Sequence, residues 1–268
     1  MKKGFLGQKG PIIMGVLNVT PDSFSDGGKF DSVEKALARA LEIEKEGASI
    51  IDIGGESSGP NSKYVSLEEE LSRVIPLLSK LRKQTKMLIS IDTYKAEVAR
   101  QALELGADMI NDVTALRGDP EMASVIAKYK CPIVMMYSKD RDVRTKVLAK
   151  KYTDVVLTVK KFLSERIKYA EKNGIKKSQI IIDPGMGQFV SAIPSYSFEI
   201  LGRMGELKTL GLPVLIGVSR KSFLGGEMAS RLDKGLAASA IAYYSGAKIF
   251  RTHDVKATNQ FFICQKCN

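Results

Sequence analysis

The stretch Val214-Leu-Ile-Gly-Val-Ser-Arg-Lys-Ser-Phe-Leu-Gly225 joins a short apolar run to a polar turn. Its apolar half, residues 214–218, follows Pro213 and predicts a short buried strand. Two hydroxyls and two cations come next, which is a suitable set for holding an anion. A helix that began at Ser222 would add free N–H groups and a positive dipole end. One isolated run of this kind is more often a solvated turn, so its meaning depends on the rest of the chain.

The same succession of an apolar run and a polar end recurs along the chain. Strands are predicted at 12–17, 49–53, 87–91, 109–110, 133–136, 180–182, 214–218 and 248–250. Helices are predicted at 32–46, 66–84, 95–105, 120–128, 152–173, 196–210, 234–245 and 255–263. Eight strands that alternate with helices predict an α/β protein with a parallel sheet closed into a TIM (β/α)8 barrel. A doubly wound open sheet is the alternative, although no G-x-G-x-x-G follows the first strand.

Length and composition suit a single domain that spans residues 1–268. The chain is 44% hydrophobic and 26% charged, and we find no linker rich in Pro, Gly or Ser. No stretch is long enough to span a membrane, and Met1-Lys-Lys lacks a signal-peptide core. Cys131 leads into an apolar run, and Cys264-Gln-Lys-Cys267 lacks the further ligands of a zinc site. We therefore expect a cytoplasmic protein without disulfides and with no membrane partner.

The chain carries a formal net charge of +11. An anionic small substrate, nucleic acid and solvated surface lysines can each account for such an excess. Many lysines fall within the predicted helices, where solvation explains them. Zinc-finger spacing and aromatic-rich RNA-binding patterns are absent from the sequence. Nucleic acid is therefore the least expected partner, and a small molecule the most expected one.

Polar side chains follow almost every predicted strand. In a barrel these strand ends meet at the face where chemistry takes place. A single Asp after a strand is most often a helix cap or a turn former, but so many polar ends on one face indicate a site. In chain order the polar ends are Asn18, Asp52, Glu56, Asp92, Asn111, Asp112, Tyr137, Asp183, Ser219, Arg220, Lys221, Ser222, Arg251 and His253.

These residue types suit a heterocycle that carries an anionic leaving group. Acceptors for the N–H donors of a guanidine-like edge are available from Asp92, Asn111 and Asp183. Cations that can bind ring acceptors or stack on the ring are Lys221 and Arg251. A polyanion can be held by Asn18, Arg251, His253 and the Asp26-Gly-Gly28 turn. No nucleophilic Cys or Ser–His–Asp order is evident, which favours displacement without a covalent enzyme intermediate.

The motifs at these strand ends resemble those of dihydropteroate synthases. The first motif is Met14-Gly-Val-Leu-Asn-Val-Thr-Pro-Asp-Ser-Phe-Ser-Asp-Gly-Gly28. The others, in order, are Asp52-Ile-Gly-Gly-Glu-Ser57, Ile91-Asp-Thr93, Ile110-Asn-Asp-Val113, Asp183-Pro-Gly-Met-Gly187, Ser219-Arg-Lys-Ser-Phe-Leu-Gly225 and Arg251-Thr-His-Asp-Val255. They run from the first predicted strand to the last, so the resemblance covers nearly the whole chain.

The resemblance implies a TIM-barrel transferase of folate biosynthesis that is a homodimer, uses Mg²⁺ and is a sulfonamide target. Such enzymes join (7,8-dihydropterin-6-yl)methyl diphosphate to 4-aminobenzoate and release 7,8-dihydropteroate and diphosphate. The route proposed for the family is dissociative, because diphosphate leaves before the aniline nitrogen captures a pterin-methyl cation.

Motif positions in the resemblance imply a role for each site residue. The catalytic residues would be Asp92, Lys221 and Arg251, with Asp92 stabilising the cation. The pterin contacts would be Asp92, Asn111, Met136, Asp183, Lys221 and Arg251. The 4-aminobenzoate contacts would be Ser58, Pro60, Phe189 and Ser222. The diphosphate contacts would be Asn18, Arg251 and His253, and Asn18 would also bind the metal.

Three positions depart from the family pattern. Gly59 stands where an arginine is common, and Tyr137 stands where a histidine is usual. Gln188 takes the place of a phenylalanine, and Phe189 follows one residue later. The first two departures leave a pterin-binding homologue with weak or altered activity as the alternative function.

The stretch Ser57-Ser-Gly-Pro-Asn61, together with the displaced Phe189, partly resembles the sulfonamide-insensitive branch of the family. Two interpretations of Phe189 follow. Its ring either crowds out the bulkier group of a sulfonamide, or only packs on the aminobenzoate ring.

Overall fold

The computed structural model describes residues 5–7, 10–20, 29–60 and 62–263. The Asp26-Gly-Gly28 turn, Asn61, Cys264 and Cys267 lie outside these residues. Within them, no helix combines the length and apolar character that crossing a membrane requires.

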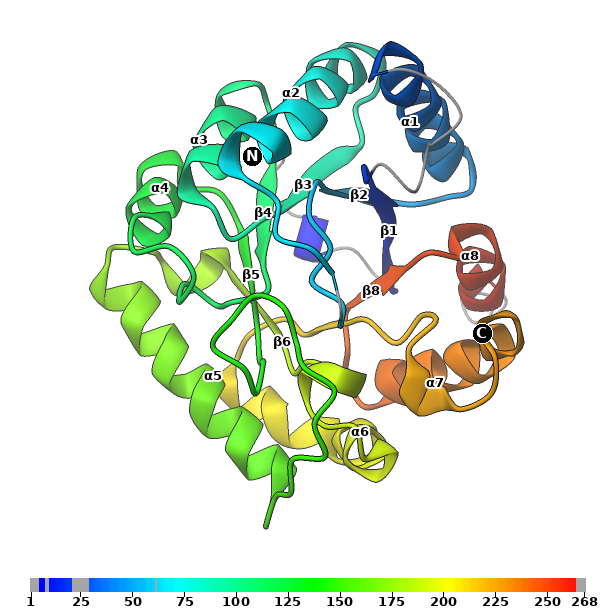
Figure 1. Ribbon diagram of the computed structural model, residues 1–268. Coiled ribbons are helices and arrows are strands. Elements are labelled where there is room, and N and C mark those ends of the chain that lie inside the picture. The colour runs from blue at the N-terminus through cyan, green and yellow to red at the C-terminus, as the bar shows by residue number, and fades with distance from the viewer. Residues whose placement is uncertain (1–4, 8–9, 21–28, 61, 264–268) are drawn as a thin grey trace.

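Eight parallel strands form one sheet that curls into a ring (Figure 1). The strands are β1 (Ile12–Asn18), β2 (Ile50–Gly54), β3 (Leu88–Asp92), β4 (Met109–Asp112), β5 (Ile133–Met136), β6 (Ile180–Asp183), β7 (Leu215–Ile216) and β8 (Ile249–Thr252). Their order in the sheet is β6-β5-β4-β3-β2-β1-β8-β7, and a parallel bridge between Ile182 and Val214 joins the two ends. The predicted TIM barrel is confirmed, and the open doubly wound sheet is wrong.

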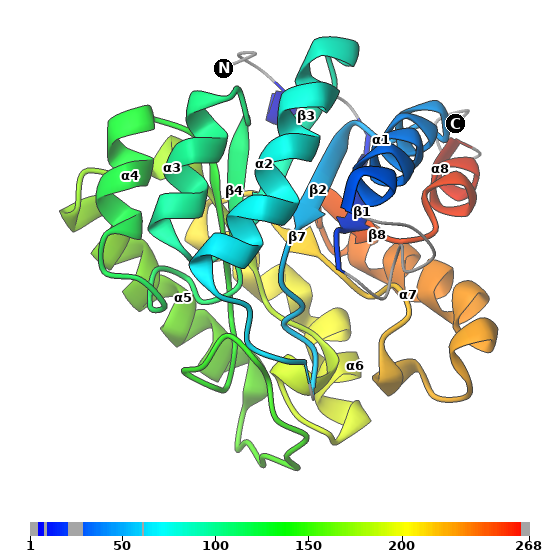
Figure 2. The ribbon, with the colours of Figure 1, turned by 45° about the horizontal axis from the view of Figure 1, so that its top comes forward.

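Helices alternate with the strands and surround the ring (Figures 1 and 2). They are α1 (Lys29–Lys45), α2 (Leu67–Gln84), α3 (Ala96–Glu104), α4 (Met122–Tyr129), α5 (Val155–Lys172), α6 (Pro194–Arg203), α7 (Leu232–Tyr244) and α8 (Val255–Ile263). Two of them, α2 and α5, are preceded by a residue whose side chain caps the first turn. The Ser66 hydroxyl accepts from the Glu69 N–H, and the Asp154 carboxylate accepts from the Leu157 N–H.

Apolar side chains fill one end of the barrel interior. They form a single buried cluster of Ile12, Met14, Ile50, Leu88, Met109, Val134, Ile181, Leu215 and Ile249. Leu6, from the short 3₁₀-helix η1 (Phe5–Gly7), packs against this cluster. Figure 2 shows η1 at the end of the barrel where the strands begin. Side chains alternate along a strand, so residues two or four positions after these apolar residues also point into the barrel. They lie at its other end, where the strands finish.

The structure corrects the prediction that a helix begins at Ser222. Residues Ser222–Leu224 form only one 3₁₀ turn, η6, and α7 begins at Leu232. Gly225 and Gly226 follow with φ of 69° and 70°, a left-handed conformation that ends the turn. Ser222 therefore has no long helix dipole behind it, and an anion there would meet only the first N–H groups of a short turn and nearby side chains.

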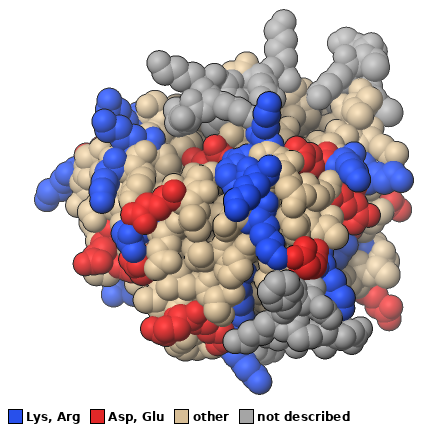
Figure 3. Space-filling view, turned by 90° about the horizontal axis from the view of Figure 1, so that it is seen from above, with Lys and Arg blue, Asp and Glu red and all other residues tan. Residues whose placement is uncertain are grey.

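Charges of both signs are mixed on the face that carries α1 and α2 (Figure 3). Arg39 pairs with Glu46 at 2.6 Å, and Arg82 pairs with Asp108 at 2.9 Å. Such pairing distributes the basic side chains among carboxylates on this face. It agrees with the interpretation of the surface lysines and arginines as solvated side chains.

Candidate active site

Two adjoining cavities lie at the carboxyl ends of the strands. The first has a volume of about 520 Å³, and its lining includes Asp92, Asn111, Met136, Asp183, Lys221 and Arg251, which are all six expected pterin contacts. The second has a volume of about 880 Å³, and its lining includes Pro60, Phe189, Lys221 and Ser222. Phe189 and Lys221 line both cavities, so these two side chains form a shared wall.

Strand register brings the residues of the first cavity together. Asn111 lies two residues after Met109 of the apolar interior, and Arg251 lies two residues after Ile249. Asp92 pairs in register with Asn111 on the neighbouring strand. The polar residues thus form the layer above the apolar interior, on the face where barrel enzymes place their chemistry.

Asp183 ends β6 and lines the first cavity. Its Oδ1 atom accepts a hydrogen bond of 2.8 Å from the Gly185 N–H. Gly185 has a φ of 67°, and a Cβ there would lie 2.3 Å from the Tyr137 carbonyl oxygen, so only glycine fits this turn. Burial raises the pKa of Asp183 to about 6, although the Gly185 N–H and the Lys221 charge oppose the shift. A ligand that presents N–H donors would stabilise this buried carboxylate.

Arg251 is held by two carboxylates. Its Nε donates to Asp52 Oδ2 at 2.6 Å, and its NH2 group donates to Asp92 Oδ2 at 2.7 Å. Asp52 is fully buried and also accepts from Asn111 Nδ2 at 3.0 Å. The other oxygen of Asp52, Oδ1, has no hydrogen-bond partner in the described part of the chain. Asp52, which the sequence placed among the polar strand ends, therefore holds Arg251 and Asn111 in position, and sequence reasoning assigned it no such contact.

Asp92 is a carboxylate in a largely dry environment. Burial raises its pKa to about 7, the Arg251 charge opposes this, and the negative charge of Asp52 adds to it. Asn18, at the end of β1, lies close by. A Cβ on Gly54 would lie 3.5 Å from both Asn18 Oδ1 and Asp92 Cβ. The absence of a side chain at Gly54 leaves room between the amide and the carboxylate.

Lys221 stands between the two cavities. Its Nζ atom lies 4.9 Å from the centroid of the Phe189 ring, a cation–π contact. Burial lowers its pKa to about 8, although the negative charge of Asp183 opposes this shift. The ammonium group can therefore serve a ligand on either side of the shared wall.

His253 is linked to the loop that follows β7. Its Nδ1 atom lies 3.3 Å from the Ser219 hydroxyl, which also donates to Asp254 Oδ2 at 3.3 Å. Burial and the neighbouring Arg251 charge lower the pKa of His253 to about 4, so the imidazole is neutral near pH 7. A neutral imidazole carries one N–H, so His253 can donate to an anion from Nε2 when its Nδ1 atom accepts from the Ser219 hydroxyl.

The second cavity has a cationic side. Arg220 and Arg231 line it together with Ser222 and Gln188. The Gln188 amide nitrogen lies 3.4 Å from the Ser222 hydroxyl. Ser58, an expected aminobenzoate contact, lines the first cavity, whereas its neighbour Gly59 lines the second. A carboxylate bound here would meet a hydroxyl and an amide, beside two guanidinium groups that already donate to Asp254 and to main-chain carbonyl oxygens.

Two of the polar strand ends point away from the cavities. The Asp112 carboxylate accepts from the N–H groups of Thr114 and Leu116, so it is a turn former. Tyr137 packs edge-to-face on Phe162 of α5, with ring centroids 5.2 Å apart. Its hydroxyl lies 3.0 Å from the Tyr152 hydroxyl, so Tyr137, which stands where the family has a histidine, packs between the barrel and α5.

Glu56 serves a structural ion-pair network. It accepts from Lys95 Nζ at 2.6 Å and from Arg144 at 2.8 Å. Lys95 also pairs with the buried Glu70 of α2. The network fixes the loop after β2 between α2 and the connection that follows β5.

Comparisons with known proteins agree with this geometry. The model of the family described as pterin binding enzyme matches residues 14–253. A dihydropteroate synthase of Synechocystis sp. is 42% identical over 262 residues, which cover 96% of this chain and 89% of that protein. The solved structure of Xanthomonas albilineans dihydropteroate synthase with 4-aminobenzoic acid has a TM-score of 0.90 and 42% identity, covering 97% of this chain and 93% of that chain. The same enzyme in complex with 7,8-dihydropteroate has a TM-score of 0.85 and 41% identity, covering 97% and 94%. The chain therefore belongs to the pterin-binding enzymes and, among them, to the dihydropteroate synthase family.

Proposed function

We propose that the two cavities join (7,8-dihydropterin-6-yl)methyl diphosphate to 4-aminobenzoate, giving 7,8-dihydropteroate and diphosphate. The observation that carries the proposal is the shared wall of Phe189 and Lys221. On one side, buried carboxylates suit a heterocycle rich in N–H donors. On the other, cations and a hydroxyl suit an aromatic carboxylate. The reacting atoms of the two substrates would meet between these subsites.

The pterin lies in the first cavity in this proposal. Asp183 accepts hydrogen bonds from the N–H edge of the pterin, which removes the cost of burying the carboxylate unpaired. Asn111 and Lys221 bind the ring's remaining polar atoms. Met136 and the guanidinium of Arg251 pack on its faces.

The reaction needs no covalent enzyme intermediate. The bond between the pterin methylene and the diphosphate oxygen breaks, and its electron pair leaves with diphosphate. Asp92 opposes the positive charge that develops on the pterin-methyl group. The lone pair of the aniline nitrogen then forms the new C–N bond, and the nitrogen releases a proton to solvent.

The leaving diphosphate is assigned to Asn18, Arg251 and His253. Among the described residues, no three His, Cys, Asp or Glu side chains gather as a metal site. A single amide oxygen on Asn18 still fits Mg²⁺, which commonly keeps its waters and binds substrate phosphates with few protein ligands. The metal would neutralise charge on the diphosphate. Gly59 supplies no cation here, so Arg251 carries more of this role.

We also propose a homodimer in the cytoplasm. On α7, Ile241 and Tyr244 are exposed by 49% and 73%. Exposed apolar side chains on one helix support an interface between copies. Light scattering at micromolar concentration tests this state, and a monomer would contradict it.

Mass spectrometry of the reaction products tests the function. Incubation with both substrates is expected to give 7,8-dihydropteroate and diphosphate in equal amounts, and omission of 4-aminobenzoate removes the first product. Pterin binding with no condensation product would favour the alternative of a homologue with weak or altered activity.

A further inference from the structure

The connection between β5 and α5, residues 137–154, crosses the carboxyl face of the barrel beside the loop that follows β2 (Figure 1). The two are joined by a hydrogen bond of 3.3 Å from Thr145 N to the Ser58 carbonyl oxygen. We call residues 137–154 the β5–α5 connection. Its residues Thr145 and Val147 line the second cavity, and it belongs to no helix or strand, so its conformation depends on specific contacts.

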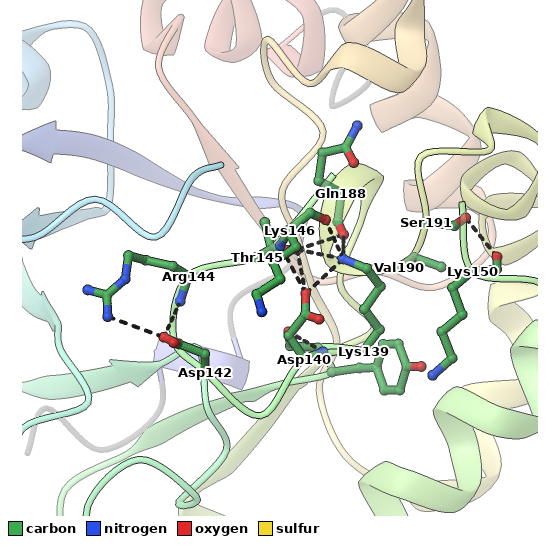
Figure 4. A network of polar contacts seen from close by, with 12 residues as sticks. Lys139, Asp140, Asp142, Arg144, Thr145, Lys146, Lys150, Gln188, Val190 and Ser191 are labelled. Atoms are coloured by element: carbon green, nitrogen blue, oxygen red, sulfur yellow. Dashed lines mark hydrogen bonds and ion pairs between the residues drawn. The ribbon is translucent and has the colours of Figure 1, made fainter. Parts of the chain in front are cut away.

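A buried lysine holds this connection together. The Lys139 side chain is only 1% exposed. Its Nζ atom lies 2.8 Å from Asp140 Oδ2, Thr145 Oγ1 and the Lys146 carbonyl oxygen, and 2.5 Å from the Gln188 carbonyl oxygen. Figure 4 shows the ammonium group at the centre of these partners. Burying an ammonium group is costly unless its hydrogen bonds are made. These contacts therefore favour the one conformation of the β5–α5 connection in which all of them form.

The contacts of Lys139 fasten the turn η4 (Gly187–Phe189). The Gln188 carbonyl accepts from Lys139 Nζ and, at 2.8 Å, from the Thr145 hydroxyl. The Phe189 carbonyl accepts from the Lys139 N–H at 2.9 Å. The β5–α5 connection therefore fixes the main-chain oxygens of Gln188 and Phe189, the two residues of η4 whose side chains line the second cavity.

The side chains of the same two residues line the second cavity. Phe189 forms the shared wall with Lys221, and the Gln188 amide lies beside Ser222. They thus stand at the aryl end and the carboxylate end of the proposed amine subsite. A shift of η4 would move both contacts together.

Lys139 itself is absent from the lining of either cavity. We infer that Lys139 is a positioning residue that sets the affinity for the aromatic amine by fixing Gln188 and Phe189. The inference rests on the proposed function, because it needs the second cavity to be the amine subsite. The pterin contacts Asp183 and Asn111 come from strand ends, which do not depend on this lysine.

Steady-state kinetics of Lys139→Met and Lys146→Met test the inference. Both changes remove an ammonium group from the same connection, but Lys146 is exposed. Lys139→Met is expected to raise the KM for 4-aminobenzoate about tenfold, with kcat and the KM for the pterin substrate changed by less than about threefold. Lys146→Met is expected to match wild type. An unchanged KM for 4-aminobenzoate, or an equal rise for both substrates, would overturn the inference.

If Lys139→Met does not fold, the variant Thr145→Val tests the same positioning of Gln188. It removes the second donor to the Gln188 carbonyl and keeps the shape of a side chain that itself lines the second cavity. A smaller rise in the KM for 4-aminobenzoate is expected, with the KM for the pterin substrate unchanged. An equal change in the two KM values would again overturn the inference. If wild type forms no product, the proposed function fails by itself. Equilibrium binding of 4-aminobenzoate to the same variants then shows whether Lys139 positions the subsite.

Discussion

The Nε atom of Arg251 donates to Oδ2 of Asp52 at 2.6 Å. The two residues come from β8 and β2, the strands on either side of β1. Asp52 contacts no bulk solvent, so this pairing fixes the guanidinium in the first cavity before any substrate binds. Preorganisation of this kind lowers the cost of placing a cation beside a leaving anion.

Asp52→Asn is expected to lower kcat/KM about tenfold to a hundredfold. The amide keeps the size of the side chain but replaces a charge-assisted hydrogen bond, which contributes about 1.5–3 kcal/mol. Asp112→Asn is the matched control, because Asp112 is equally buried at a strand end but faces away from the cavities. It is expected to lower the Tm with little kinetic effect. Equal kinetic losses in the two variants would contradict the role of Asp52.

The sequence predicted the barrel because apolar runs, polar ends and helices alternate in a regular order. The alternation of side chains along a strand also separates the polar residues that face the barrel interior from those that face outward. Asn111 and Met136 point inward, so their successors Asp112 and Tyr137 point outward. Counting from the apolar interior could have made this distinction, and it also places Asp52, two residues after Ile50, on the inward face.

Other features depend on loop conformation and could not be read from local pattern. The expected helix at Ser222 fails because two glycines in the left-handed region end the turn. The contact between Lys139 and Gln188 joins residues 49 positions apart through two irregular segments. Strand periodicity gives no information about such contacts.

The pH dependence of kcat/KM is expected to be bell-shaped. Ionised Asp183 is needed to accept from the pterin and ionised Asp92 to oppose the cation, so their pKa values of about 6 and about 7 set the acidic limb. Protonated Lys221 is needed in the shared wall, and its pKa of about 8 sets the basic limb.

Lys221→Ala is expected to lower turnover strongly while the circular dichroism spectrum stays that of wild type. Unchanged kcat/KM in this variant would contradict a role for the Lys221 ammonium group in the reaction.

Asp183→Asn is expected to gain stability relative to wild type as the pH rises. The pKa of Asp183 is raised to about 6 from 3.8, so the stability it contributes is present below the lower value and lost as pH rises through the higher one. The ligand-free wild type therefore carries a cost above about pH 6 that the amide lacks. Measurement of the Tm of both proteins at about pH 4 and about pH 7.5 checks this. A Tm difference that does not change with pH would contradict it.

Phe189→Ala is expected to weaken 4-aminobenzoate and sulfonamide binding by the same factor. The ring is buried and lies under the Lys221 ammonium, which suits packing on the aryl ring that both ligands share. The ratio of sulfonamide Ki to aminobenzoate KM is then unchanged. A fall in that ratio would support the other interpretation, in which Phe189 crowds out the bulkier inhibitor.

Calorimetric titration of wild type and Asp183→Ala with a pterin tests the central claim, that the first cavity is the pterin site. Wild type is expected to bind one pterin per chain. The variant is expected to lose roughly 2–5 kcal/mol of binding free energy, because the N–H edge of a buried pterin loses its acceptor. Circular dichroism establishes that the variant is folded. Near-normal pterin affinity in the folded variant would contradict the assignment of Asp183 and, with it, the account of the site.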